Sequence, residues 1–136
     1  MGGLTARAYV RACGSERVAT LITIATPHQG SVMARFGLGR NARQMRDGSA
    51  WIAALGQAGL PASLPVVSIY SLHDSLLVPQ DNAILPGAQL MPLTGRGHNE
   101  MLVSRSILGF LLSLPDSAPA DVKRRELKSE YPASIA

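Results

Sequence analysis

The sequence contains little that would support disulfide bonding, nucleic-acid binding or membrane insertion. Cys13 is the only cysteine, so the chain can form no internal disulfide and no cysteine-rich metal framework. Aromatic residues make up 4% of the 136 residues and are scattered, whereas a stacking platform for single-stranded nucleic acid needs several on one strand face. The longest nearly continuous apolar run, 107–114, is too short to cross a bilayer. We therefore expect neither a nucleic-acid partner nor a transmembrane segment.

Motifs for metals, dinucleotides and secretion are also lacking. The histidine and acidic residues do not have the close spacing of a zinc site. Residues 37–41, Gly-Leu-Gly-Arg-Asn, do not complete a G-x-G-x-x-G motif. The first seven residues have neither the basic region nor the apolar core of a signal peptide. We predict no metal and no cofactor, and the sequence leaves the compartment of the protein open.

Charge is sparse and uneven along the chain. Charged residues make up 16% of the sequence, and the formal net charge is +4. The first 50 residues hold seven arginines against two acidic residues, Glu16 and Asp47. These arginines are spread among apolar residues rather than gathered in a run, which favours ordinary solvated faces over an anion-binding surface.

The hydrophobic pattern predicts an α/β protein. Residues 4–13 have helical spacing, with Leu4 and Ala8 on one side and Arg7 and Arg11 on another, and Gly14 ends the helix. Short apolar segments at 18–25 and 65–71 have the profile of buried parallel strands, and residues 88–93 form a weaker third strand. Helical spacing also occurs within 31–60 and over 100–114. This order of helices and strands is typical of a mostly parallel sheet with flanking helices.

Polar residues follow each predicted strand. His28 comes after the first strand, Asp74 after the second and His98 after the third. Ligands of open parallel sheets bind at the carboxyl ends of the strands, so these side chains are candidates for one site. A carboxylate that orients an imidazole makes a general base, which indicates Asp74 and His98 as a catalytic pair. Each residue also has a structural interpretation as a turn, cap or loop residue.

The nucleophile of such a pair is missing from the sequence. No G-x-S-x-G motif occurs anywhere in residues 1–136. The chain opens Met1-Gly2-Gly3 and continues directly into a predicted helix. Small residues that lead into a helix also come directly after the serine in a strand–serine–helix turn.

On these motifs the chain resembles the bacterial lipase and esterase branch of the α/β-hydrolase superfamily. Met1-Gly2-Gly3 is similar to the part of the nucleophile turn after the serine, and residues 26–31 (Thr-Pro-His-Gln-Gly-Ser) to a turn of those lipases. Residues 68–74 with Val78-Pro79 resemble the acid strand, and Gly97-His98 the histidine loop. The resemblance covers residues 1–114 and implies the C-terminal half of an α/β-hydrolase fold that begins just after its serine.

The resemblance implies a role for three residues. Asp74 would be the triad acid, His98 the base, and the backbone N–H of Met1 one donor to the oxyanion. The substrate would be a small-molecule ester or a lipid. Residues 36–60 fall where the family has lid or cap helices, and Trp51 and Met45 there are candidates for contact with a lipid interface. Simple packing of these two side chains on the sheet is an equally good interpretation.

Two alternatives remain beside a serine ester hydrolase. An acyltransferase would use the same triad but pass the acyl group to an alcohol. A non-catalytic interaction module would be a decayed hydrolase. In each case we expect the 136-residue chain alone to be inactive or nearly so, because it lacks the serine. Residues 115–136 become strongly charged from 121 onward, and we expect them to be a mobile tail.

Overall fold

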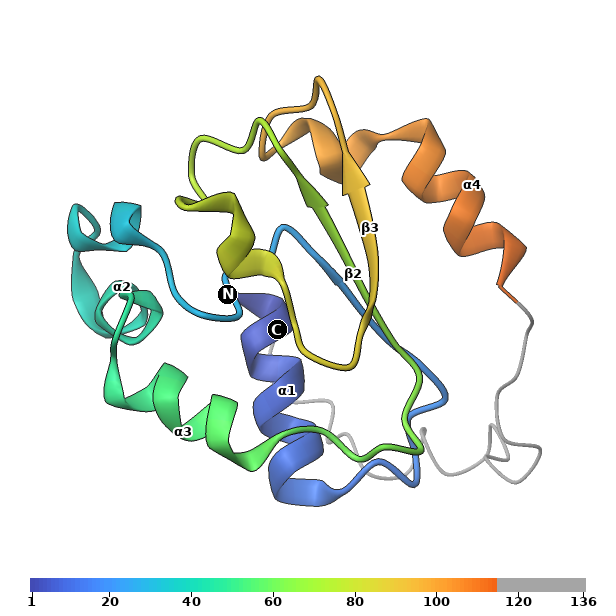
Figure 1. Cartoon of the computed structure of the whole chain (residues 1–136), viewed down its shortest axis with the longest axis horizontal. Coiled ribbons are helices and arrows are strands. Elements are labelled where there is room, and N and C mark those ends of the chain that lie inside the picture. Colours follow the sequence, from blue (N-terminus) through green and yellow to red (C-terminus); the bar gives the residue numbers. More distant parts are fainter. Residues whose placement is uncertain (115–136) are drawn as a thin grey trace, which may run out of the picture.

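A computed structural model describes residues 1–114, and its fold is mixed α/β as predicted. A parallel sheet in the order β1-β2-β3 is flanked by helices (Figure 1). The strands are β1 (Leu21–Ile24), β2 (Val66–Ser71) and β3 (Gln89–Leu93). The α-helices within this range are α1 (Gly2–Cys13), α2 (Gly39–Met45), α3 (Ala50–Ala58) and α4 (Arg105–Ser113), with short 3-10 helices η1 (Val32–Arg35), η2 (Gln80–Ala83) and η3 (Glu100–Val103). The predicted tail, 115–136, lies outside the described residues.

Helices pack on both faces of β1 and β2, and both of these strands contribute apolar side chains to each face, whereas the edge strand β3 is mostly exposed. Successive side chains of a strand point to opposite faces. Val10 of α1 packs with Leu21 and Val66 on one face. Ile107 of α4 packs with Val67 and Ile69 on the other. Figure 1 shows α1 and α4 on opposite sides of the strands.

Two elements differ from the prediction in their limits. The first strand begins at Leu21 rather than at residue 18, because its pairing with β2 begins where Leu21 is opposite Val66. The helix predicted over 100–114 is divided into η3 and α4 at Ser104, whose backbone is extended (φ −71°, ψ 121°). Helix α1 ends at Gly14 as predicted, with Gly14 at φ 81°.

The segment that contains α2 and α3 packs onto α1. Ile52 and Leu55 of α3 form a buried cluster with Leu4 of α1, and Met45 and Trp51 pack against it. The helical spacing within residues 41–57 predicts that Met45, Trp51, Ile52 and Leu55 lie near one another. Their main partner is α1 rather than a strand of the sheet.

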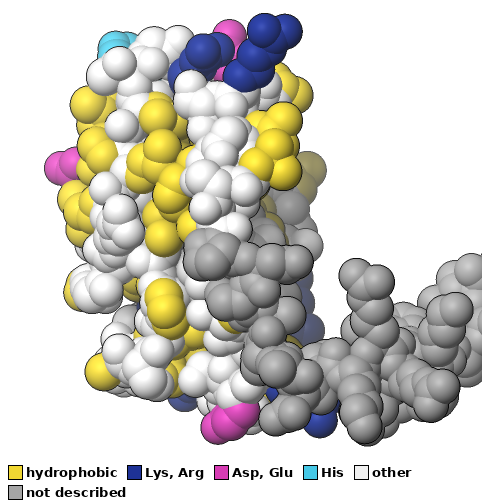
Figure 2. All heavy atoms as spheres, turned by 90° about the vertical axis from the view of Figure 1, so that its right-hand side faces the viewer, with side chains coloured by type: hydrophobic (Ala, Val, Ile, Leu, Met, Phe, Trp, Pro, Cys, Tyr) yellow, Lys and Arg dark blue, Asp and Glu magenta, His cyan; other side chains and the backbone are white. Residues whose placement is uncertain are grey.

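The face that carries α4 presents hydrophobic side chains to the surface. Figure 2 shows them gathered in several places on this side of the molecule. Leu108 and Leu112 are 56% and 78% exposed. Even so, no helix within residues 1–114 is both long and apolar enough to cross a membrane.

Candidate functional site

Asp74 is a buried carboxylate held in one orientation by the turn after β2. Its side chain is 1% exposed. Its Oδ1 accepts hydrogen bonds from the backbone N–H groups of Leu76 (2.8 Å) and Leu77 (2.9 Å). The Gln80 amide donates to the Asp74 backbone carbonyl (2.9 Å), a contact that the sequence pattern did not predict. With Oδ1 occupied in this way, Oδ2 is the oxygen directed at a further partner.

That partner is His98, in the loop between β3 and η3. The distance from its Nδ1 to Asp74 Oδ2 is 2.7 Å, and its side chain is 31% exposed. An ionised carboxylate only accepts hydrogen bonds, so the Nδ1 nitrogen must carry the proton that is shared with it. In the neutral ring the proton-accepting nitrogen is therefore Nε2. No residue within 1–114 forms a hydrogen bond with Nε2.

The loop that carries His98 is fastened to the neighbouring strand. Ser71 at the end of β2 donates its hydroxyl to the Arg96 carbonyl. The Glu100 carboxylate accepts the backbone N–H of Gly97 (2.7 Å). Because both anchors are adjacent to His98, the imidazole stays opposite Asp74. The structure thus brings together Asp74 and His98, two of the three side chains expected at the strand ends.

A cavity of about 240 Å³ lies beside His98. Most of its wall is apolar, which suits a hydrocarbon group of a ligand. Met1, the residue before α1, also lines it, so the start of α1 and the imidazole belong to one site. The lining residues are Met1, Ala25, Pro27, Ser31, Met33, Ala34, Met45, Leu76, Leu77 and His98.

Ser31 is the one serine in this cavity wall, and its hydroxyl is used for structure. Ser31 Oγ donates to the Leu76 carbonyl (2.9 Å) and accepts the backbone N–H groups of Met33 (3.2 Å) and Val78 (3.3 Å). It therefore caps η1 and joins it to the turn after Asp74. None of these bonds involves His98, so Ser31 is not arranged as the nucleophile of the pair.

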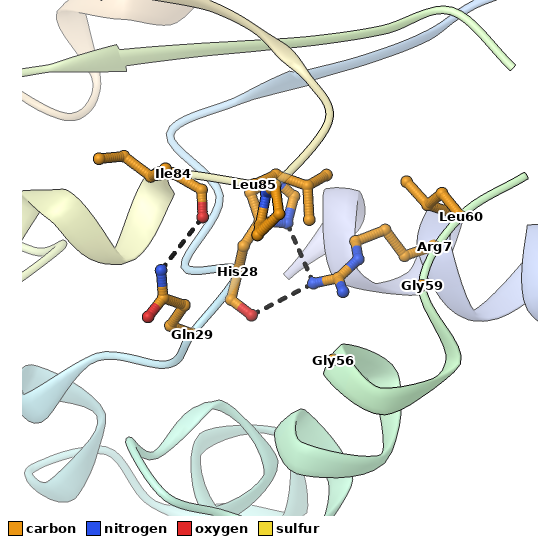
Figure 3. A pocket seen from close by; sticks show the side chains of 9 residues that line it. Arg7, His28, Gln29, Gly56, Gly59, Leu60, Ile84 and Leu85 are labelled. Carbon is orange, nitrogen blue, oxygen red and sulfur yellow. Dashed lines mark hydrogen bonds between the residues drawn. The ribbon is translucent and has the colours of Figure 1, made fainter. Parts of the chain in front are cut away.

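The third candidate, His28, lies in a separate buried cluster. Arg7 is always a donor, so its Nη1 donates to His28 Nδ1 (3.3 Å), as Figure 3 shows. His28 Nε2 then carries the proton and donates to Thr23 Oγ1 (2.9 Å). Burial, and secondarily the positive charge of Arg7, lowers the pKa of His28 to about 3. His28 is thus a neutral structural residue near pH 7.

Arg7 corrects the expectation that the N-terminal arginines lie on solvated faces. It is 4% exposed, and its Nη2 donates to the Leu55 carbonyl (3.0 Å). The buried residues of α1 are Leu4, Arg7 and Val10, spaced three apart. This spacing was a usable signal, but the acceptors of Arg7 come from residues 28 and 55, which the helix pattern alone does not bring to it.

The buried neutral state of His28 predicts a loss of stability in mild acid. The unfolded chain takes up a proton on His28 below its ordinary pKa of 6.5, whereas the folded chain does so only near 3. The free energy of unfolding should therefore fall as pH is lowered from 6.5 towards 3, with a contribution approaching about 1.4 kcal/mol per pH unit. Urea unfolding between pH 6.0 and 4.5 measures this slope. His28→Gln should have a shallower slope, and equal slopes would contradict the assignment.

Comparison with known proteins does not assign the chain to a family. No model of a protein family matches the chain, and no curated protein matches it.

Proposed function

We propose that Asp74 and His98 are the acid and base of a serine ester hydrolase of the lipase or esterase type, built on an α/β-hydrolase fold. The nucleophile would be a serine encoded directly upstream of Met1. The observation that carries this proposal is the 2.7 Å hydrogen bond between buried Asp74 and His98 at the carboxyl ends of neighbouring parallel strands. An acid on one strand followed by a histidine after a later strand is the order of the α/β-hydrolase triad.

The position of Met1 supports the placement of the serine. In this fold the nucleophile lies on a tight turn between a strand and a helix. Met1 immediately precedes α1 and lines the same cavity as His98. A residue directly before Met1 would thus lie at or near the wall of this cavity. The 1–114 sheet also pairs β1 on one side only, with β2, which leaves its other edge for a preceding strand.

The chemistry would follow from this geometry. The serine Oγ attacks the ester carbonyl carbon while His98 Nε2 takes its proton, and Asp74 stabilises the imidazolium through Nδ1. The backbone N–H of Met1 donates to the oxyanion of the tetrahedral intermediate. His98 then gives the proton to the departing alkoxide, which leaves as the alcohol. Water, deprotonated by His98, attacks the acyl carbon, the bond from that carbon to the serine Oγ breaks, and His98 returns the proton to Oγ as the carboxylic acid leaves.

The apolar wall of the cavity supports a hydrophobic acyl group as substrate. Met33 and Met45, which are adaptable apolar side chains, line the cavity with Leu76. Nearby in the chain, Phe36 and Leu38 are 79% and 97% exposed. Large apolar side chains this exposed favour a role of the 36–60 segment as a lid that contacts a lipid interface.

Two experiments test the proposal: the first reads the coding sequence upstream of Met1, and the second measures the activity of the longer protein. The coding sequence upstream of Met1 should continue in frame through an apolar strand that ends in Gly-x-Ser. The protein that includes this segment should hydrolyse p-nitrophenyl butyrate, and a competing alcohol distinguishes ester hydrolysis from acyl transfer. An in-frame stop codon before any such serine would refute the proposal.

The 136-residue chain by itself should show no ester turnover above the uncatalysed rate. The reason is that His98 has no serine hydroxyl to deprotonate within residues 1–114. Release of p-nitrophenolate by the purified chain and by its His98→Ala variant measures this. Turnover that is present in the chain and lost in the variant would mean that the nucleophile lies inside the sequence.

A further inference from the structure

A second cavity, also of about 240 Å³, lies between α1, the end of α3 and the segment after η2 (Figure 3). It shares no lining residue with the cavity beside His98. Its polar lining side chains are Arg7, His28 and Gln29, and no acidic residue lines it. The remaining lining residues are Gly56, Gly59, Leu60, Ile84, Leu85 and Pro86.

Arg7 brings a positive charge to this cavity, and no acidic side chain within residues 1–114 pairs with it. Its three hydrogen bonds go to His28 Nδ1, the His28 carbonyl and the Leu55 carbonyl, all neutral acceptors. Within residues 1–114 no carboxylate forms a salt bridge with Arg7, and the one contact between a basic and an acidic side chain joins His98 and Asp74. A buried guanidinium that lacks an anion is costly, because desolvation is not offset by a charge of opposite sign. Burial lowers the pKa of Arg7 for the same reason.

Part of the guanidinium is free to bind a ligand. Arginine has five N–H donors, and the three bonds of Arg7 use two on Nη1 and one on Nη2. The donors on Nε and the second on Nη2 have no acceptor within residues 1–114. In a guanidinium, the Nε–H and the Nη2–H on the same side match the two oxygens of a carboxylate. His28 does not compete for the anion, because it is neutral and its Nε2–H is bonded to Thr23.

We propose that this cavity binds a short-chain monocarboxylate, with the carboxylate on Arg7 and the hydrocarbon tail along Leu60, Leu85 and Pro86. The cavity is smaller than the 300–1,000 Å³ or so of sites for drug-sized ligands, which limits the tail to a few carbons. The apolar lining distinguishes this ligand from inorganic phosphate. The inference rests on residues 1–114 alone and does not require the proposed ester hydrolase.

The binding test uses the 136-residue chain and sodium butyrate. Titration followed by two-dimensional amide NMR should give saturable shifts at Gly59, Leu60 and Gln29. At equal concentration, n-butanol, n-butylamine and phosphate should give at most a tenth of the saturation seen with butyrate. Absence of saturable shifts with butyrate, or equal shifts with butanol or phosphate, would overturn the proposal.

Two variants of the cavity and one control variant outside it locate the site. Leu60→Glu places a negative charge in the cavity wall without touching the bonds of Arg7, and it should weaken butyrate binding at least tenfold. Leu102→Glu makes the same change at a residue that is 68% exposed and outside this cavity, and it should leave binding unchanged. Arg7→Lys keeps the charge but loses the paired donors, and it should also weaken binding tenfold or more if it folds. Unchanged affinity in folded Leu60→Glu would overturn the assignment.

Discussion

If the proposed upstream serine completes the site, Asp74→Asn should lower kcat for ester hydrolysis by the longer protein by about 10⁴-fold. The two backbone N–H groups of Leu76 and Leu77 that now bond Oδ1 would select the amide oxygen of the new side chain. Its NH₂ group would then face His98 Nδ1 and donate to it. The ring proton would move to Nε2, which could no longer accept the proton of the serine. Loss of activity would thus come with little change in the shape of the site.

Controls separate this effect from a loss of folding. Asp81→Asn makes the same substitution at an exposed position of η2, and it should leave kcat within twofold of the parent. The double variant Asp74→Asn/His98→Ala should be no less active than His98→Ala alone, because triad members act as a unit. Steady-state kinetics with p-nitrophenyl butyrate measures all four proteins. Additive losses in the double variant would show that the two residues act independently.

Gly30→Ala should give the largest loss of stability among the glycine substitutions. Gly30 has φ +95°, and an added Cβ would lie 2.6 Å from the Asp47 Cα and 2.7 Å from its backbone nitrogen. The turn cannot yield easily, because the Gly30 carbonyl accepts the Asn82 amide and the next residue, Ser31, pairs with Arg46. Backbone strain and overpacking together predict a decrease of about 2–5 kcal/mol in the free energy of unfolding.

Gly87→Ala is the matched control for this prediction. Gly87 also has positive φ, +81°, but no atom lies within 4 Å of an added Cβ. Gly87→Ala should therefore lower the free energy of unfolding only by the cost of positive φ in alanine, about 1–2 kcal/mol. Urea unfolding followed by circular dichroism compares the two variants. Equal losses would mean that the close approach of Asp47 has no energetic effect.

The sequence was sufficient to predict the three parallel strands, helix α1 and the meeting of Asp74 and His98. Short apolar segments bounded by proline and glycine predicted three parallel strands, and parallel strands place their carboxyl ends at one edge of the sheet. The exact start of β1 was not predictable, because Val18 is as apolar as the paired residues. Only the register with β2, which begins at Val66, decides where the strand begins.

Two features of the structure were not predicted from the sequence: the break at Ser104 and the burial of Arg7. Ser104 divides the expected C-terminal helix, although the apolar pattern continues through it. Arg7 is buried because His28 and Leu55 supply acceptors from distant parts of the chain. A helical pattern treats arginine as a polar residue and therefore places Arg7 on the solvent side of the helix. For this reason the sequence did not predict the cavity beside Arg7.

Labelling with a fluorophosphonate tests the central claim most directly. This probe forms a covalent adduct with a serine only where a neighbouring base activates its hydroxyl. In the protein that includes the segment encoded upstream, peptide mass spectrometry should find the adduct on the serine proposed to precede Met1 directly, and His98→Ala should abolish it. No adduct, or an adduct on a serine within residues 1–136, would contradict the assignment of Asp74 and His98 to that nucleophile.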